Sequence, residues 1–129
     1  QTRNRRVVRY ILTKLERQIS GVELDPDAES INIEHVLPQN PSDEWNFSDA
    51  EAQGAIYRIG NMTLLRKDDN REINNSSYES KKPVFSDCDF SITSSIPKEY
   101  DDWNIDTVGA RQSSLANTAS GIWRISQFD

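Results

Sequence analysis

The chain has 129 residues and a formal net charge of −6 at pH 7, from 15 Lys and Arg against 21 Asp and Glu. This length favours one domain over residues 1–129, and a start at Gln1 rather than Met leads us to expect a fragment of a larger protein. The single cysteine, Cys88, excludes an internal disulfide framework and a zinc site built on four cysteines. Because the sequence contains no membrane-spanning apolar run and no signal-peptide pattern, we expect a cytoplasmic protein that does not enter a membrane.

Positive charge is concentrated in two regions of the sequence. Residues 1–20 carry six Lys and Arg against one acid, residues 21–55 carry nine acids and no base, and residues 56–82 carry six bases against four acids. Affinity for nucleic acid comes largely from Lys and Arg that neutralise phosphates. We therefore expect a weak stand-alone DNA binder that can still cut DNA held by another domain.

The first predicted element is an amphipathic helix over residues 5–19, in which apolar residues recur at helical spacing: Val8, Ile11, Leu12, Leu15 and Ile19. Its basic face contacts nucleic acid or an upstream domain in one interpretation, and faces solvent in the other. Gly21 is the predicted C-cap. A turn at Asp25-Pro26-Asp27 then leads into a predicted strand near residues 30–36.

The middle of the chain contains a predicted short helix and a second strand. A loop over residues 40–45 is followed by Ser48, the predicted N-cap of the helix, and by Glu51, which completes a capping box. The second strand is predicted over residues 58–65. Within it, Gly60 permits a bulge or a close approach of the backbone to another element.

Three helices are predicted in the remaining sequence. Asp68 or Asp69 caps the first, and Ser76 or Ser77 caps a second that runs through residue 82, where Pro83 ends or bends it. Residues 85–93 are rich in Ser and Asp and too short for an assignment. The third helix is amphipathic and follows the predicted N-cap Asn104; its apolar residues are Ile105, Val108, Leu115, Ala119, Ile122 and Trp123.

His35 is the only histidine of the chain. The segment Ile33-Glu34-His35-Val36-Leu37-Pro38-Gln39 places it near the end of a strand, directly after an acid and three residues before a proline. Only imidazole has an unperturbed pKa near neutral pH, so His35 is the candidate general base. From this segment alone, a structural histidine without a catalytic role is the alternative interpretation.

A family resemblance rests on residues that follow this segment. Asn61 and Asn70 stand nine residues apart in the stretch GNMTLLRKDDN. The order His, Asn, Asn resembles the HNH (His-Me finger) nucleases, whose ββα unit carries the His on one strand, a middle Asn on the next and a metal-binding His or Asn at the helix start. The wider series IEHVLPQNP, IGNMTLL, YESKK and a late W-x-I-x-x-V-x-x-R resembles the C-terminal nuclease domain (DUF1524-like) of GmrSD-type modification-dependent restriction enzymes, over nearly the whole chain.

The resemblance implies an α+β fold with a ββα-metal core between an N-terminal and a C-terminal amphipathic helix. It also implies a single HNH nuclease domain, at the C-terminal end of a larger protein, that hydrolyses phosphodiester bonds in foreign or modified DNA. One Mg²⁺ or Mn²⁺ ion needs few protein ligands, and Glu34 and Asn70 supply a carboxylate and an amide oxygen. His35 is then free to act as the base, and Asn61 orients the loop or the His ring.

Two of these roles have open alternatives. Neighbours in a regular strand point to opposite faces, so Glu34 and His35 reach one site only if the backbone twists or bulges there. Otherwise Glu34 is a solvent-facing strand residue. Asn61 is alternatively a turn residue beside Gly60.

Substrate and partners complete the sequence-based expectations. Lys81, with Arg58 or Lys82, is the candidate contact for a substrate phosphate, and a solvated surface position is the alternative for each. The implied partners are DNA and an upstream DUF262-like nucleotide-binding sensor domain. Two other functions stay open: a catalytically inactive HNH-fold interaction domain, which the acidic surface favours, and an RNase toxin.

Overall fold

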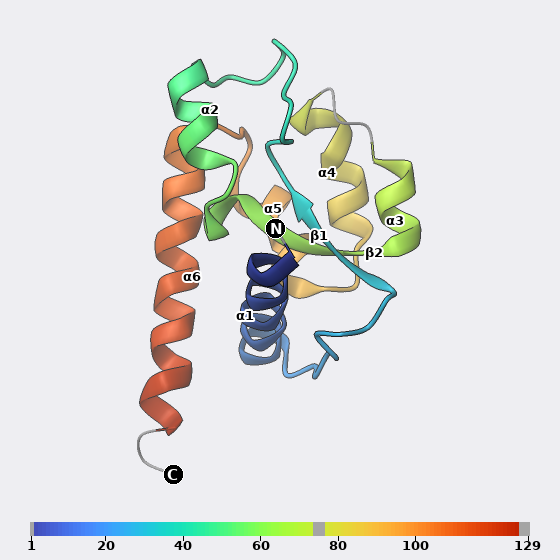
Figure 1. The fold of residues 1–129 in the computed structure, drawn as a ribbon, viewed down its shortest axis with the longest axis vertical. Helices are drawn as coiled ribbons and strands as arrows, with labels where there is room; N and C mark the ends of the chain where they lie inside the picture. Colours follow the sequence, from blue (N-terminus) through green and yellow to red (C-terminus); the bar gives the residue numbers. More distant parts are fainter. Residues whose placement is uncertain (1, 74–76, 127–129) are drawn as a thin grey trace.

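The computed structural model describes residues 2–73 and 77–126, and the side chains of residues 4–70, 73 and 77–122. The protein is α+β: within the described residues, six α-helices surround one two-stranded antiparallel sheet (Figure 1). None of the described helices combines the length and hydrophobicity that a membrane span needs. The elements in chain order are α1 (Thr2–Ser20), β1 (Ile31–His35), α2 (Asp49–Ala55), the 3₁₀ helix η1 (Ile59–Asn61), β2 (Met62–Arg66), α3 (Lys67–Glu72), α4 (Tyr78–Asp87), α5 (Ser91–Glu99) and α6 (Ile105–Ser126).

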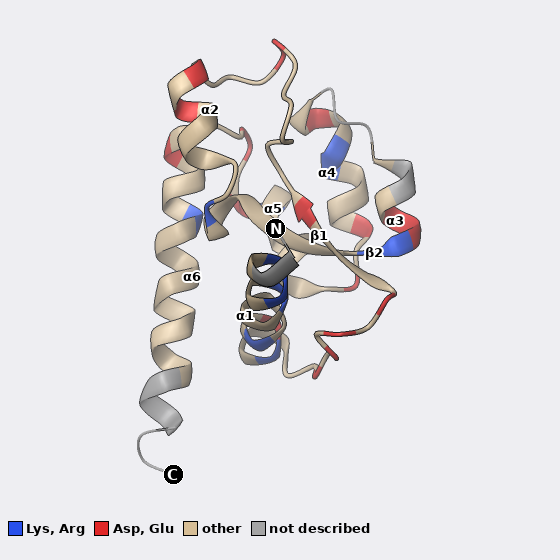
Figure 2. Ribbon diagram, in the orientation of Figure 1, with Lys and Arg blue, Asp and Glu red and all other residues tan. Residues whose placement is uncertain are grey.

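The N-terminal helix and its C-cap are confirmed. Leu12 and Leu15 of α1 are buried in the core. Gly21 has φ +81°, and its N–H donates to the carbonyl of Arg17 at 2.8 Å, as expected of a left-handed C-cap. Figure 2 shows Lys and Arg along α1, whereas Asp and Glu occupy the segments before β1 and around α2. The basic and the acidic parts of the sequence therefore lie on different elements of the fold.

Local capping signals also predicted two other helix starts. The hydroxyl of Ser48 accepts from the N–H of Glu51, and the Glu51 carboxylate accepts from the N–H of Ser48, which confirms the capping box of α2. Ser77 caps α4, whereas Ser76 lies outside the described residues. Asn104 accepts from the N–H of Thr107 at 3.0 Å at the start of α6, as predicted.

Two predicted helix boundaries need correction, and part of a stretch without an assignment forms a helix. The N-cap position of α3 is Arg66, so Asp68 and Asp69 lie in the first helical turn, where acids favour the helix dipole, and do not cap it. α4 continues past Pro83 to Asp87, because the fully buried Phe85 anchors its last turn in the core. Residues 91–99, partly covered by the unassigned stretch, form α5.

The second predicted strand is shorter than expected, because residues of α6 hydrogen-bond to the backbone where that strand was predicted to begin. Residues 59–61 form η1, and β2 begins only at Met62. The N–H of Gly60 donates to Gln112 Oε1 at 2.5 Å, and its carbonyl accepts from Arg111 Nη1 at 3.0 Å. A Cβ at Gly60 would lie 2.5 Å from the carbonyl oxygen of Val108. The predicted close backbone approach at Gly60 is therefore confirmed, and its partner is α6.

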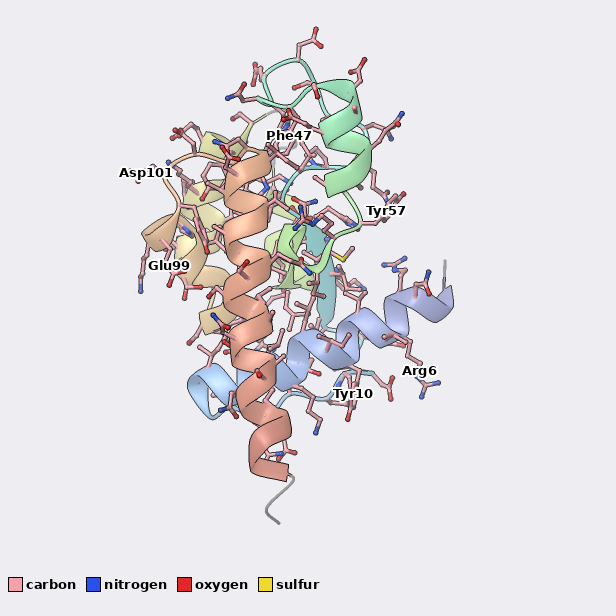
Figure 3. All side chains as sticks on the ribbon, turned by 90° about the vertical axis from the view of Figure 1, so that its left-hand side faces the viewer. Arg6, Tyr10, Phe47, Tyr57, Glu99 and Asp101 are labelled. Atoms are coloured by element: carbon pink, nitrogen blue, oxygen red, sulfur yellow. The ribbon has the colours of Figure 1, made fainter. Side chains whose placement is uncertain are left out.

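The sheet has two unlike faces. Its register is regular, from Ile31 opposite Arg66 to His35 opposite Met62. α4 and α5 lie behind the sheet in the view of Figure 1, and the N-terminal part of α1 lies in front of it, as the turned view of Figure 3 also shows. Successive side chains of β1 therefore point alternately toward α4 and α5 or toward α1.

Candidate active site

His35 is the last residue of β1, and its side chain lines an open groove of about 780 Å³ between the sheet and α1. Strand alternation places Ile33 on the same face. The groove is lined by Asn4, Arg5, Val7, Val8, Ile33, His35, Gln39, Tyr57 and Met62. An imidazole, a guanidinium, two amides and a phenol thus share one cleft with an apolar floor.

Tyr57 forms the rim of this groove beside His35. The two rings meet edge to face, with centroids 6.0 Å apart and an angle of 86° between the ring planes. Tyr57 is 68% exposed and projects on the side of the molecule where α1 begins (Figure 3). Gln39 Nε2 donates to its hydroxyl at 3.4 Å. The groove is therefore open to a large ligand at this end.

The environment of His35 favours the neutral imidazole. Burial lowers its pKa from the ordinary value of 6.5, and the positive charges of Lys81 and Arg5 lower it further. A histidine that is neutral around pH 7 can accept a proton from water or from a hydroxyl group. The shift therefore favours the neutral form of His35, which is the form that a general base requires.

Asn61 is fully buried and holds the turn that follows His35. Its Oδ1 accepts from the N–H of Leu37 at 2.8 Å and from Trp103 Nε1 at 2.9 Å. Its Nδ2 donates to the carbonyls of Leu37 at 3.0 Å and Ile56 at 3.1 Å, and its own carbonyl accepts from the N–H of Val36 at 2.9 Å. These bonds use the full capacity of the amide. Asn61 therefore contacts the loop and not the His35 ring.

Glu34 lies on the other face of β1 from His35. The ladder pairs Glu34 with Thr63 and His35 with Met62 without a bulge, so the distortion that a shared site requires is absent. The Glu34 side chain is 10% exposed and forms an ion pair with Lys81 at 3.0 Å. Burial raises the pKa of Glu34 and lowers that of Lys81, and the attraction between the two charges opposes both shifts.

Lys81 is completely buried, which gives the prediction of a phosphate contact no support. Its Nζ donates to Glu34 Oε2 at 3.0 Å, to the His35 carbonyl at 2.8 Å and to the Val36 carbonyl at 3.0 Å. An ammonium group has three N–H donors, so none remains for a substrate. The face of the buried Trp45 ring lies 5.5 Å from the same nitrogen.

The other predicted phosphate contacts also lie outside the groove lining. Lys82 pairs with Glu79 at 3.0 Å and lies over the Tyr78 ring at 5.1 Å. Arg58 is half-buried at the position before η1. The basic residue that does line the groove is Arg5, which the sequence marked only as part of a basic helix face.

Asn70 lies in α3 and is half-buried. α3 begins at the far end of the sheet from His35, because the N–H of Lys67 donates to the carbonyl of Ser30 at 2.8 Å. Asn70 is not among the residues that line the groove. The structure therefore does not bring Glu34, His35 and Asn70 together in one cleft.

A divalent ion held by Glu34 and Asn70 does not fit this arrangement. The carboxylate of Glu34 is directed to a buried ammonium group, and a second cation beside it would be repelled. Among the residues that the structure describes, no group of three or more His, Cys, Asp and Glu side chains is placed to hold a metal ion. The His35 groove contains nitrogen and oxygen donors but no carboxylate.

Of the residues that line the groove, His35 is the one that was predicted as a site residue, and the polar residues Asn4, Arg5, Gln39 and Tyr57 were not. Gln39 ends the segment that carries His35, so that motif was its signal. Arg5 was visible as one of several bases on the first helix, without a sign that it faces His35. Tyr57 follows α2 in a loop, and its position depends on how the loop packs, so local sequence contains no signal for it.

A comparison with protein families identifies the class to which the chain belongs. The model of the family described as GmrSD restriction endonucleases, C-terminal domain, matches residues 1–118. The match defines the class of protein: a nuclease domain of a restriction endonuclease, with DNA as its substrate. Within that class, the chain belongs to the GmrSD C-terminal domain family. No curated protein and no solved structure matches the chain.

Proposed function

We propose that this domain is an HNH-type endonuclease that hydrolyses DNA phosphodiester bonds with His35 as the general base, in the restriction of foreign or modified DNA. One observation carries the proposal: His35 is half-buried in an open groove that Arg5 also lines. Its pKa is lowered, which favours the neutral imidazole that accepts a proton. Membership of a restriction endonuclease family supplies the reaction class and the substrate.

The groove residues suit the steps of phosphodiester hydrolysis. His35 accepts a proton from water as the water oxygen bonds to phosphorus, and the P–O bond to the departing 3′ oxygen breaks. Arg5 provides fixed positive charge for the non-bridging oxygens, whose negative charge increases in the transition state. Both groups lie on the lining of one groove, so one phosphate can meet them together.

The order of elements supports the HNH subtype. A strand that ends in His35, a second antiparallel strand and a helix follow one another as β1, β2 and α3. Asn61 precedes β2, and Asn70 follows it in α3. This strand, strand and helix order is the one that a ββα core requires.

The proposed cofactor is a single divalent metal ion. A single Mg²⁺ or Mn²⁺ ion would neutralise charge on the phosphate. Because Glu34 is engaged with Lys81, we assign no step to this ion. Calorimetric titration of Mn²⁺ into the parent and Asn70→Ala chains tests the remaining predicted ligand. Equal affinities in the two chains would remove Asn70 from the ligand set.

Target recognition is proposed to come from an upstream DUF262-like nucleotide-binding domain. The chain has 15 Lys and Arg against 21 Asp and Glu, and the groove lining includes one of these bases, Arg5. So few bases give little affinity for DNA at physiological salt. A second domain would hold the DNA while the groove cuts it.

Cleavage of supercoiled plasmid tests the proposed function. The chain, with Mg²⁺ or Mn²⁺ and with chelator, is incubated with modified and unmodified phage DNA, with plasmid and with structured RNA. We expect metal-dependent nicking or linearisation of DNA. Absence of cleavage even at low salt and high protein concentration, where weak DNA binding no longer limits the reaction, would favour the inactive interaction domain. Cleavage of the RNA alone would favour the RNase toxin.

A further inference from the structure

The ammonium group of Lys81 is fully buried, although lysines are normally exposed. It lies next to the backbone of the candidate base His35 and faces away from the groove. We propose that Lys81 is a positioning residue: it holds the end of β1 that carries His35, and Glu34 serves as the counter-ion of Lys81 and not as a metal ligand. This inference rests on the proposed function of His35.

The contacts of Lys81 account for its burial. A buried ammonium is stable only when it is paired with an opposite charge and its remaining hydrogens have acceptors. Glu34 provides the charge at 3.0 Å, and the carbonyls of His35 and Val36 accept the other two hydrogens at 2.8 and 3.0 Å. All three bonds end on consecutive residues, 34 to 36, at the end of β1. The ammonium is therefore bound specifically to the segment that carries the base.

Asn61 binds backbone groups of residues 36 and 37 that Lys81 does not bind. Lys81 binds the carbonyls of His35 and Val36, whereas Asn61 binds the N–H of Val36 and both backbone groups of Leu37. The backbone after His35 is thus held by the Lys81 side chain and by the side chain and backbone carbonyl of Asn61, which come from different elements. These bonds restrict the backbone position from which the His35 side chain projects.

α4 lies on the face of the sheet opposite the groove, and this position determines how Lys81 can act. Lys81 comes from α4, on the face of the sheet away from α1, and its side chain has no exposed surface. It cannot touch DNA in the groove. Its effect on cleavage must pass through the backbone of residues 35 and 36 or through the positive charge that helps to lower the pKa of His35. Measurement of kcat at a pH where the rate no longer changes with pH removes the second route. A misplacement of a reacting group by about 1 Å is enough to cost a rate factor on the order of 10².

The test compares Lys81→Met with the double variant Glu34→Leu/Lys81→Met and with the control Lys98→Met, a change of an exposed lysine on α5. The double variant removes both buried charges together, and replacement of a complete ion pair by apolar residues is often tolerated. Thermal melting and circular dichroism establish that each chain is folded. Plasmid cleavage then gives kcat and KM.

We expect Lys81→Met and the double variant to lose roughly 10- to 100-fold in kcat with little change in KM, and Lys98→Met to match the parent. If Lys81→Met does not fold, the double variant decides. A folded double variant with parental kcat would overturn the proposal. A rise in KM at constant kcat would also overturn it, because that result indicates a substrate contact.

Two further measurements separate this inference from its alternatives. NMR resolves the imidazole of the only histidine in the chain. We expect the chemical shift of its fully neutral form, measured well above its pKa, to move in the double variant even without substrate, which a change of pKa alone does not produce. Unchanged His35 signals would contradict the positioning role. In Glu34→Gln, we expect the Mn²⁺ concentration for half-maximal cleavage to stay at the parental value, and an increase would restore Glu34 as a ligand. Parental cleavage by His35→Ala would instead refute the proposed function itself.

Discussion

The two faces of the β1–β2 sheet differ in the burial of their polar side chains and in their access to solvent. On the face toward α4 and α5, Glu34 pairs with Lys81, and the buried hydroxyls of Thr63 and Thr93 are 2.7 Å apart. On the face toward α1, His35 borders an open groove with the exposed Tyr57 at its rim. Glu34 and His35 are neighbours in the chain, yet strand alternation gives one a closed polar network and the other access to solvent.

This difference indicates that the two faces of β1, a strand of five residues, have different roles. Among the described residues, every buried side-chain nitrogen or oxygen has a hydrogen-bond partner, so the closed face has no free group for chemistry. The open face has groups that are only partly desolvated. Substitutions on the closed face should therefore affect stability or positioning, and those on the groove face should affect cleavage directly.

The largest expected effect comes from His35→Ala on the groove face. Loss of the general base should lower kcat by about 10²- to 10⁴-fold, the usual contribution of a positioned base, and leave the fold unchanged. Single-turnover cleavage of plasmid at saturating metal measures the loss, and circular dichroism checks the fold. Because the chain has no second histidine, no other imidazole can substitute. Parental activity in the variant would show that the groove is not the active site.

A smaller effect is expected from Arg5→Gln, which removes the guanidinium from the groove. Cleavage should fall by roughly 10-fold, the equivalent of one hydrogen bond to a charged group. The positive charge of Arg5 helps to lower the pKa of His35, so its removal should raise that pKa and move the acidic limb of the pH–rate profile to higher pH. In the parent, half-maximal activity should lie below pH 6.5, the ordinary value for histidine.

Arg6→Gln is the matched control for this experiment. Arg6 is the next residue of α1, but its side chain is 81% exposed and lies 3.9 Å from Asp27. It should leave both the rate and the pH profile unchanged. Identical shifts in the two variants would mean that the general charge of α1, and not the groove position of Arg5, affects His35.

The smallest effect is expected from Thr63→Val on the closed face. Thr63 is fully buried, and its hydroxyl exchanges a hydrogen bond with Thr93. Loss of one neutral hydrogen bond should lower the free energy of unfolding by about 1 kcal/mol. Urea denaturation measures this change, and plasmid cleavage at a temperature well below the melting point should match the parent. A large loss of kcat in the folded variant would break the distinction between the two faces.

Local sequence signals predicted the parts of the fold that depend on neighbouring residues. The capping box at Ser48, the cap at Asn104 and the periodicity of α1 all act within a few positions. The unassigned α5 shows where such signals end. The N–H groups of Ser91 and Ile92 at its start donate to the carboxylate of Glu16 at 2.9 and 2.7 Å, and Glu16 lies 75 residues earlier in the chain than Ser91.

The candidate site was predictable to the same extent. The strand-end motif predicted the position of His35, because a lone imidazole between an acid and a proline is visible in the sequence. The placement of Lys81 was not visible, because a lysine beside Lys82 on an amphipathic helix is normally exposed. Its burial depends on Glu34, which is 47 positions away. The groove positions of Arg5 and Tyr57 likewise require the packing of α1 and of the loop after α2 against the sheet.

The contacts of η1 and Asn61 also constrain when the groove can form. Asn61 is held by Trp103, and Gly60 by Arg111 and Gln112 of α6, over sequence separations of 42, 51 and 52 residues. During synthesis, the strand with His35 therefore leaves the ribosome long before the residues that fix the turn beside it. Non-local contacts of this kind form late in folding. A growing chain that ends before Trp103 contains the whole His, Asn, Asn series but lacks the contacts that fix its geometry, so the groove can form only after residues 103–112 have been synthesised.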